Sequence, residues 1–328
     1  MNWVAVDLGA STIKASVLDM GNNPVRLSYP MGDYTTTLLS SVVVVTEDKK
    51  VIMGDYASQL GVSNPNMRER DWLHSVHKSL IAKAIFETIK QASVRHYNDS
   101  NIGIVLLYNN TVDSELKSIA EIVFSEVKTI QAGEVLKRII SPNSNLVLVA
   151  DFGESAFRVT LQEKTERLYH NANKTLGFSS IDMFSLIDYD DISSHSSIEI
   201  ALLGQMMQRI KIMANNGDDV VLPKNISAKG NSLSSCFEQK MTTFLYQCFE
   251  ECTNAIKTTS KTWENVDEVV FIGGGAHSNI IDTIFEKNMH CTLVSYNSKN
   301  RGFDAQYATT NCAIQMPLRT NTEVVIKY

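Results

Sequence analysis

The stretch that decides the fold is residues 3–18, which read WVAVDLGASTIKASVL. An apolar run over residues 3–7 ends in Asp7, and a second run over residues 12–18 alternates apolar and polar positions. Alternation with a period of two is typical of a half-buried strand, and a glycine between two such runs indicates a tight turn. The pattern predicts a β-hairpin with an aspartate at the end of its first strand and Gly9 in the turn.

The second half of the chain opens in the same way. A strand predicted over residues 146–150 leads into Asp151-Phe152-Gly153, and a returning strand is expected over residues 157–162. A third glycine turn, Gly273-Gly274-Gly275, follows a strand predicted over residues 269–272. The repeated opening is a weak internal duplication, and it predicts an α/β fold of two similar lobes that face each other across a cleft.

The expected boundary between the lobes is the turn at residues 142–145. Lobe I then covers residues 1–143 and lobe II residues 144–328, and the segment from about residue 300 is expected to return to lobe I. Hydrophobic periodicity predicts the remaining elements. Helices are expected over residues 80–96, 114–124, 133–140, 197–213, 233–258 and 278–285, and further strands over 41–46, 50–53, 102–107 and 127–130.

Composition excludes several classes of protein. The chain has 328 residues, of which 44% are hydrophobic and 20% charged, so it is expected to fold rather than remain disordered. Its net charge is −6 and no basic block stands out, which argues against a nucleic-acid-binding surface. The apolar runs are far shorter than the roughly 20 residues that span a bilayer. The start of the chain is acidic and has no signal-peptide pattern, so we expect a cytoplasmic protein. The number of cysteines is odd, 5, which favours reduced thiols.

The three glycine turns carry the chemistry. Glycine allows positive φ and lets backbone N–H groups approach an anion closely, so such turns form nests for phosphate oxygens. An aspartate at a strand end can hold a hydrated Mg²⁺, and the hydroxyls of Ser11 and Thr12 can donate hydrogen bonds. The phosphate-loop pattern G-x-x-x-x-G-K-[ST] is missing from the sequence, and the turn at residues 273–276 does not continue as G-x-G-x-x-G because Ser278 takes the last position.

The order of these segments resembles the actin and heat-shock-chaperone ATPase superfamily, which has a first phosphate loop, a second phosphate loop and an adenosine loop in this order. The closest likeness is to the nucleotide-binding domain of the seventy-kilodalton heat-shock chaperones, and it extends over essentially the whole chain. Besides the opening hairpin, the likeness is carried by residues 40–43, 53–57, 77–81, 175–177, 208–211, 269–274 and 313–315.

This resemblance implies a phosphate side of the site in lobe I. Asp7, Gly9, Ser11 and Thr12 would form the first phosphate loop, and Lys78 falls at the position of the family's catalytic lysine. In the family, the aspartate of this loop takes part in metal binding and catalysis. The resemblance therefore implies the same two roles for Asp7.

The resemblance also implies a metal and adenosine side in lobe II. Asp151 and Gly153 would form the second loop, with Asp151 a second catalytic residue and Mg²⁺ ligand. The residues implied to bind the adenosine are Arg209, Gly273, Gly274, Gly275 and His277. The implied ligands are ATP or ADP together with Mg²⁺.

Four departures from the family pattern concern catalysis. Glu154 and Arg158 stand in the second loop where the family has a glycine and an acid, and Ala132 takes the position of a water-positioning acid. His277 replaces an arginine that flanks the adenine. A carboxylate at Glu154 about 5 Å from a γ-phosphate would cost roughly 3 kcal/mol at an effective dielectric near 20. These changes predict weak or absent ATP hydrolysis.

We therefore expect a stand-alone chaperone-like protein that binds ATP or ADP and regulates a protein partner through lobe closure. No peptide-binding domain is expected after residue 315. The alternative is an actin-like ATPase that forms filaments, of the plasmid-partition or cell-shape type. A sugar or acetate kinase of the same superfamily would need an acid placed to activate a substrate hydroxyl, and the sequence offers no convincing candidate. Neither direct nucleic-acid binding nor membrane binding is expected.

Overall fold

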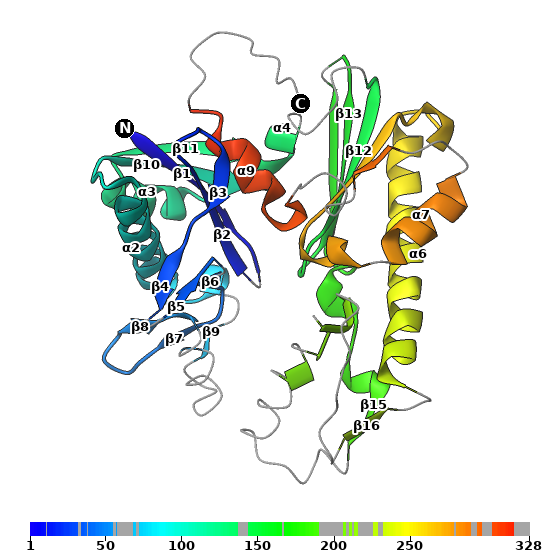
Figure 1. The fold of residues 1–328 in the computed structure, drawn as a ribbon, viewed down its shortest axis with the longest axis horizontal. Helices are drawn as coiled ribbons and strands as arrows, with labels where there is room; N and C mark the ends of the chain where they lie inside the picture. The colour runs from blue at the N-terminus through cyan, green and yellow to red at the C-terminus, as the bar shows by residue number, and fades with distance from the viewer. Residues whose placement is uncertain are drawn as a thin grey trace. The chain divides into compact units, whose positions relative to one another are not determined.

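The chain has a mixed α/β fold and divides into two compact units in the computed structural model (Figure 1). Unit 1 comprises Met1–Ser58, Glu69–Ile139 and Tyr307–Tyr328, and unit 2 comprises Gln59–Arg68 and Ile140–Gln306. The structure describes residues 1–10, 12–31, 34–37, 39–54, 57, 68–69, 72–136, 144–165, 167–189, 206–207, 210–211, 213–215, 226–228, 232–278, 280–289, 294–296 and 304–317.

A mixed sheet forms the centre of unit 1. Its strand order is β11 (Glu126–Gln131), β10 (Ile102–Tyr108), β1 (Asn2–Leu8), β2 (Thr12–Leu18) and β3 (Pro24–Arg26), and β6 (Leu39–Ser40) also pairs with β2. β1, β10 and β11 run parallel, whereas β2 and β3 are antiparallel to their neighbours. The expected opening hairpin is confirmed, with Asp7 opposite Lys14 in its register.

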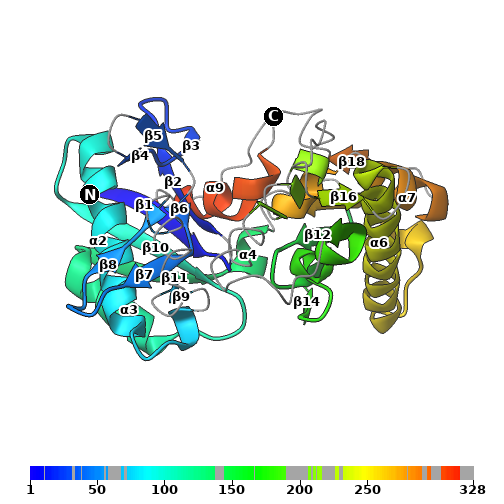
Figure 2. The same cartoon turned by 90° about the horizontal axis from the view of Figure 1, so that it is seen from below.

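Helices cover both faces of this sheet, as Figure 2 shows. α2 (Lys78–Tyr97) and α3 (Ser114–Val123) pack on one face, where Val4 and Val6 of β1 are fully buried. α4 (Ala132–Leu136) and α9 (Ala308–Ile314) pack on the other face, against Trp3 and Ala5. Coverage of both faces explains why the first strand reads as a nearly continuous apolar run.

Hydrogen bonds join α9 to the opening hairpin. Ser16 Oγ lies 2.7 Å from both Thr310 Oγ1 and Asn311 Oδ1, and the Arg26 guanidinium lies 4.6 Å from the ring centroid of Tyr307. The segment that carries α9 therefore completes the core of unit 1, although it follows unit 2 in the sequence.

The sheet of unit 2 repeats the strand order and directions of the sheet of unit 1. Its order is β14 (Leu168–Asn173), β13 (Phe157–Glu163), β12 (Leu146–Phe152), β17 (Glu268–Ile272) and β18 (Val294–Tyr296). β12, β17 and β18 run parallel, and β13 and β14 are antiparallel to their neighbours. Each sheet thus consists of three consecutive antiparallel strands followed by two parallel ones, so the predicted duplication of the openings is confirmed.

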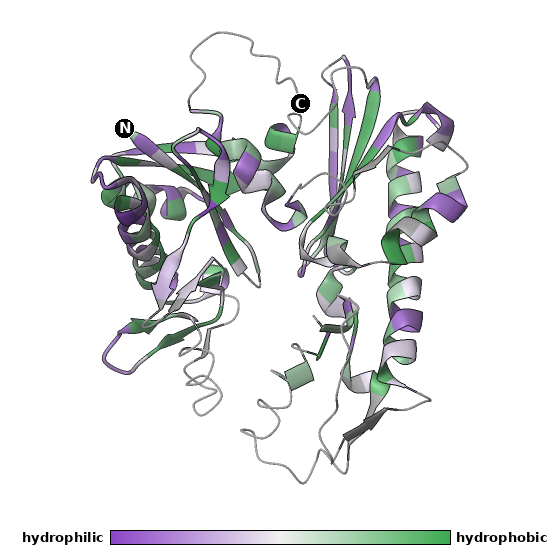
Figure 3. Cartoon of the chain, viewed as in Figure 1, coloured by the Kyte–Doolittle hydropathy of each residue, from purple (hydrophilic) through white to green (hydrophobic). Residues whose placement is uncertain are grey.

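An aromatic core fills the space between this sheet and its two helices, α6 (Leu233–Thr258) and α7 (Ile280–Met289). Phe152 lies at the centre, with ring centroids of Phe157, Phe271 and Phe285 within 5.0, 5.9 and 6.4 Å. Apolar and polar residues follow one another along α6, as the colours of Figure 3 show, and the buried residues of this helix belong to the same core. The bounds predicted for this helix are confirmed.

Short elements complete the described residues. The expected strand pair after residue 40 is present as β7 (Val43–Val45) and β8 (Val51–Ile52). Other short strands are β4 (Tyr29–Met31), β5 (Tyr34–Thr36), β9 (Arg68–Glu69), β15 (Ile187–Tyr189) and β16 (Ile226–Ala228). Single 3₁₀ turns are η2 (Trp72–His74), η3 (Phe178–Ser180), η4 (Phe184–Leu186), η6 (Trp263–Asn265), η7 (Gly274–His277) and η8 (Ala305–Tyr307).

Two predicted helices fall partly outside the described residues. The one expected over residues 133–140 is described as α4 up to Leu136, and most of the one expected over residues 197–213 lies outside. None of the helices in the described part of the chain has the length and apolar character needed to cross a membrane.

Candidate functional site

The first loop is built at the end of β1. Asp7 is paired across the hairpin with Lys14, whose Nζ donates to Asp7 Oδ2 at 3.4 Å. A Cβ on Gly9 would lie 2.6 Å from the Thr12 carbonyl oxygen, so only glycine fits this turn. The Gly9 carbonyl accepts a hydrogen bond from Ser41 Oγ. Ser11, expected to donate to phosphate, lies outside the described residues.

The second loop, at the end of β12, has the same construction. Asp151 is paired with Arg158, whose Nη1 donates to Asp151 Oδ2 at 3.3 Å. A Cβ on Gly153 would lie 2.7 Å from the Ala156 carbonyl oxygen, three residues on, as in the first loop. In each loop the basic residue stands seven positions after the aspartate. This spacing is visible in the sequence, but only the hairpin register shows that the basic residue pairs with the aspartate.

The third loop meets the second one at the Asp151 side chain. Gly273 has φ +91°, and a Cβ there would lie 2.5 Å from Asp151 Oδ1 and 2.7 Å from the Phe152 carbonyl oxygen. A Cβ on Gly275 would lie 2.9 Å from Phe152 Cβ, whereas one on Gly274 would meet none of the described residues within 4 Å. The structure thus brings Asp151, Gly153 and Gly273 together within unit 2. The His277 backbone ends η7 beside them.

The segment around η3 closes against the second loop. The Phe178 N–H donates to the Gly153 carbonyl, and the Ser179 N–H donates to the Glu154 carbonyl, both at 2.9 Å. Lys211, which is buried, donates to the Phe178 carbonyl and lies 4.3 Å from the centroid of the Phe178 ring. These contacts fix the path of the loop backbone.

Burial and two acidic side chains act in opposite directions on the pKa of Lys211. Burial lowers the pKa of Lys211, while the negative charges of Glu154 and Asp182 oppose that shift. Sequence reasoning singled out the neighbouring Arg209, which lies outside the described residues, and missed the role of Lys211.

Lys78 lies in a different setting from the one expected. It begins α2, and its Nζ lies 2.5 Å from Asp113 Oδ2 and 3.3 Å from Glu115 Oε2. Asp113 is also the N-cap of α3, where its Oδ1 accepts the Leu116 N–H. The hydrogen bond from Lys78 to Asp113 raises the pKa of Lys78, so this lysine is protonated and held by two carboxylates.

A pocket of about 310 Å³ surrounds Lys78 at the carboxyl ends of the parallel strands β1, β10 and β11. Leu8, Tyr108 and Asp113 are among its lining residues. Ligands of α/β sheets commonly bind at this edge. Asp7, however, points to the face of β1 opposite to Leu8, because side chains alternate along a strand. Lys78 therefore shares a strand edge with Asp7 but not a side-chain cluster.

Both expected Mg²⁺ ligands are paired with a basic side chain of their own hairpin. Asp7 and Asp151 each accept a hydrogen bond from a basic side chain, and Asp151 Oδ1 also lies against Gly273. Within the described ranges, no three or more His, Cys, Asp or Glu side chains gather in a way that could hold a metal ion.

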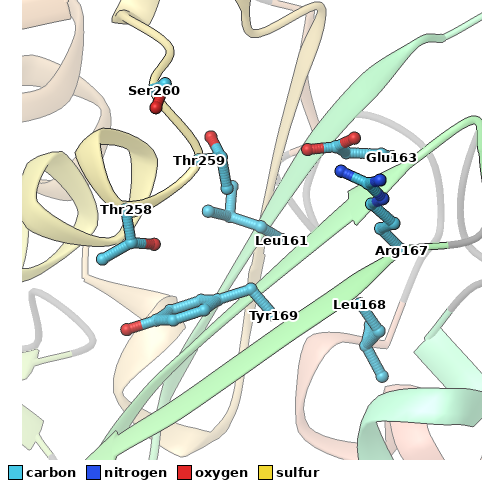
Figure 4. A pocket seen from close by; sticks show the side chains of 8 residues that line it. All are labelled: Leu161, Glu163, Arg167, Leu168, Tyr169, Thr258, Thr259 and Ser260. Atoms are coloured by element: carbon cyan, nitrogen blue, oxygen red, sulfur yellow. The ribbon is translucent and has the colours of Figure 1, made fainter.

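A second pocket, of about 360 Å³, lies at the far end of β13 from the glycine loops (Figure 4). The pocket is lined by apolar and hydroxyl-bearing side chains, among them Leu161, Tyr169 and Thr258. Glu163, which also lines it, forms an ion pair with Lys261 at 3.5 Å. It contains none of the residues predicted for the site.

No protein-family model matches the chain.

Proposed function

We propose that this chain is a cytoplasmic, chaperone-like nucleotide-binding protein with the two-lobe, actin-like fold. ATP or ADP binds at the glycine loops, hydrolysis is weak or absent, and lobe closure regulates a protein partner. The observation that carries the proposal is that one loop design occurs twice, each time with a strand-end aspartate, a glycine that tolerates no Cβ and a basic side chain.

Three features support a phosphate ligand at these loops. Glycine turns without Cβ atoms expose backbone N–H groups to an anion. Lys14 and Arg158 add positive charge beside two of the turns. Gly274 leaves open space next to its backbone, where a ligand can approach closely.

Two features support weak hydrolysis. Lys78 is held by Asp113 and Glu115, so the proposed catalytic lysine would have to leave two carboxylates in order to reach a phosphate. Ala132, at the start of α4, offers no acid to position a water. Phosphoryl transfer depends on placed charges and an oriented nucleophile, and the loss of either slows it.

Isothermal titration of the full chain with ATP, ADP and a non-hydrolysable ATP analogue tests the proposal. We expect saturable binding of at least one nucleotide, with turnover well below the roughly 1–100 per second of kinase-like enzymes. Absence of binding for all three nucleotides, with and without Mg²⁺, would contradict the proposal. Light scattering that rises with ATP would instead support the filament-forming alternative.

A further inference from the structure

The strand-end aspartates of both units already carry a counter-ion from the same hairpin. Lys14 bonds to Asp7 at 3.4 Å and Arg158 bonds to Asp151 at 3.3 Å. The four side chains are only 16–28% exposed, so the two pairs are partly shielded from water. Because both pairs are direct cross-strand partners, the hairpin register holds them in place.

The loops of unit 2 are shaped around their pair. A Cβ on Gly153 would lie 2.9 Å from Arg158 Nη1, and one on Gly273 would lie 2.5 Å from Asp151 Oδ1. Both glycines therefore make room for the ion pair itself. Arg158 Nε is buried with no hydrogen-bond partner among the described residues.

This arrangement competes with a metal ion. A hydrated Mg²⁺ needs carboxylate oxygens that face it, and a fixed cation on the same carboxylate repels a second positive charge. A guanidinium does not lose its proton in a protein, so Arg158 remains a permanent competitor. Guanidinium and ammonium groups also bind phosphate oxygens directly.

We propose that each pair, Asp7–Lys14 in unit 1 and Asp151–Arg158 in unit 2, takes the place of Mg²⁺ at its own loop, so that the loop accepts phosphate oxygens without a divalent metal. The basic side chain of each pair donates to the phosphate oxygens, and its aspartate holds it in position. This inference rests on the proposed nucleotide-binding function. It states that Lys14 and Arg158, and not a metal ion, neutralise the negative charge of the phosphate groups.

ADP titrations in EDTA and in excess Mg²⁺ test the ligand half of the proposal. We expect dissociation constants that agree within about threefold, and a value about tenfold or more tighter in Mg²⁺ would overturn the inference. Arg158→Gln and Lys14→Gln are expected to weaken ADP binding in EDTA by about tenfold each, because each removes a charge from the phosphate site. Arg167→Gln, at the far end of the same sheet, is the matched control and should bind ADP like the wild type.

Mn²⁺ binding to the nucleotide-free protein, followed by electron paramagnetic resonance, tests the metal half. We expect the wild type to leave Mn²⁺ free. Wild-type binding of Mn²⁺ that Asp151→Asn abolishes would overturn the inference. If no nucleotide binds in either buffer, the proposed function fails together with the ligand half, and the Mn²⁺ measurement still decides whether the pairs close the carboxylates to metal.

Discussion

At the scale of single residues, the glycines of the third loop have different tasks. Gly273 has a left-handed φ and contacts Asp151 and the Phe152 carbonyl, so its lack of a Cβ serves the fold. Gly274 has open space around it, and none of the described neighbours requires a glycine there. A larger side chain at Gly274 can therefore test for a bound ligand without disturbing the fold.

We therefore expect opposite outcomes for two valine substitutions. Gly273→Val should lower the free energy of unfolding by about 2–4 kcal/mol, because a β-branched residue at positive φ is strained and clashes with its neighbours. Gly274→Val should stay within about 0.5 kcal/mol of the wild type yet lose ADP affinity, because its side chain fills the approach to the backbone. Urea denaturation and ADP titration measure the two effects. Unchanged ADP affinity in folded Gly274→Val would rule out the third loop as part of the site.

His170 gives unit 2 a dependence on pH. Its Nδ1 lies 2.7 Å from Thr160 Oγ1, and burial, followed by the charge of Arg158, lowers the pKa of His170 below its ordinary 6.5, against the opposing charge of Asp151. The unfolded chain then binds a proton at a higher pH than the folded chain does. Stability is therefore lost as the pH falls through 6.5, and it is unaffected by this histidine at higher pH.

The expected outcome is a free energy of unfolding that decreases between about pH 7 and pH 5, and a smaller decrease in His170→Gln. Urea denaturation at a series of pH values measures it. An identical pH dependence in wild type and variant would show that His170 titrates alike in the folded and unfolded chains.

At the scale of elements, most of the long ones were predicted from the sequence, although the strand β14 was not. α6 and the strands of both opening hairpins follow uninterrupted hydrophobic periodicity, and their predicted bounds are close to those observed. β4, β5, β15 and β16 were not predicted, because elements of three residues carry too few positions for a period to show. The ion pairs were missed for a different reason, since they depend on a hairpin register that composition and periodicity do not report.

Lys78, the expected catalytic lysine, forms an ion pair between α2 and α3. Burial raises the pKa of Asp113, but hydrogen bonds from Lys78 and from the Leu116 N–H outweigh it and leave that pKa below its usual value. Asp113 thus both caps α3 and joins it to the start of α2. Lys78 and Asp113 thus form an ion pair that links α2 to α3 in unit 1.

Two variants of Asp113 separate its roles. Asp113→Ala removes the cap and the ion pair and should cost about 1–2 kcal/mol of unfolding free energy, whereas Asp113→Asn keeps a capping oxygen and should cost less. Lys83→Ala, which breaks an exposed pair with Glu87, should change stability by at most about 0.5 kcal/mol. Urea denaturation measures all three. Equal losses in the two Asp113 variants would show that the charge of Asp113 matters and the cap does not.

At the scale of the whole molecule, the duplicated sheets have separate cores. The core of unit 2 is the aromatic cluster around Phe152, and the core of unit 1 lies on the two faces of β1. Units with separate cores can unfold as separate cooperative blocks, so the chain need not follow a single two-state transition. Ligand binding can then be assigned to each unit through its own transition.

Our last prediction concerns these two transitions in differential scanning calorimetry. Without ligand, we expect a measured enthalpy larger than the van't Hoff enthalpy, because two blocks unfold. Asp113→Ala should lower only the transition of unit 1, which assigns it. ADP at about 100 times its dissociation constant stabilises a folded block that binds it by about 2.7 kcal/mol, which corresponds to a shift of about 5–11 °C in a domain of this size. Because the same loop is built into both units, we expect ADP to raise both transitions. A shift confined to one unit would show that only that unit binds the nucleotide, and the loop of the other unit would then not be a nucleotide-binding loop.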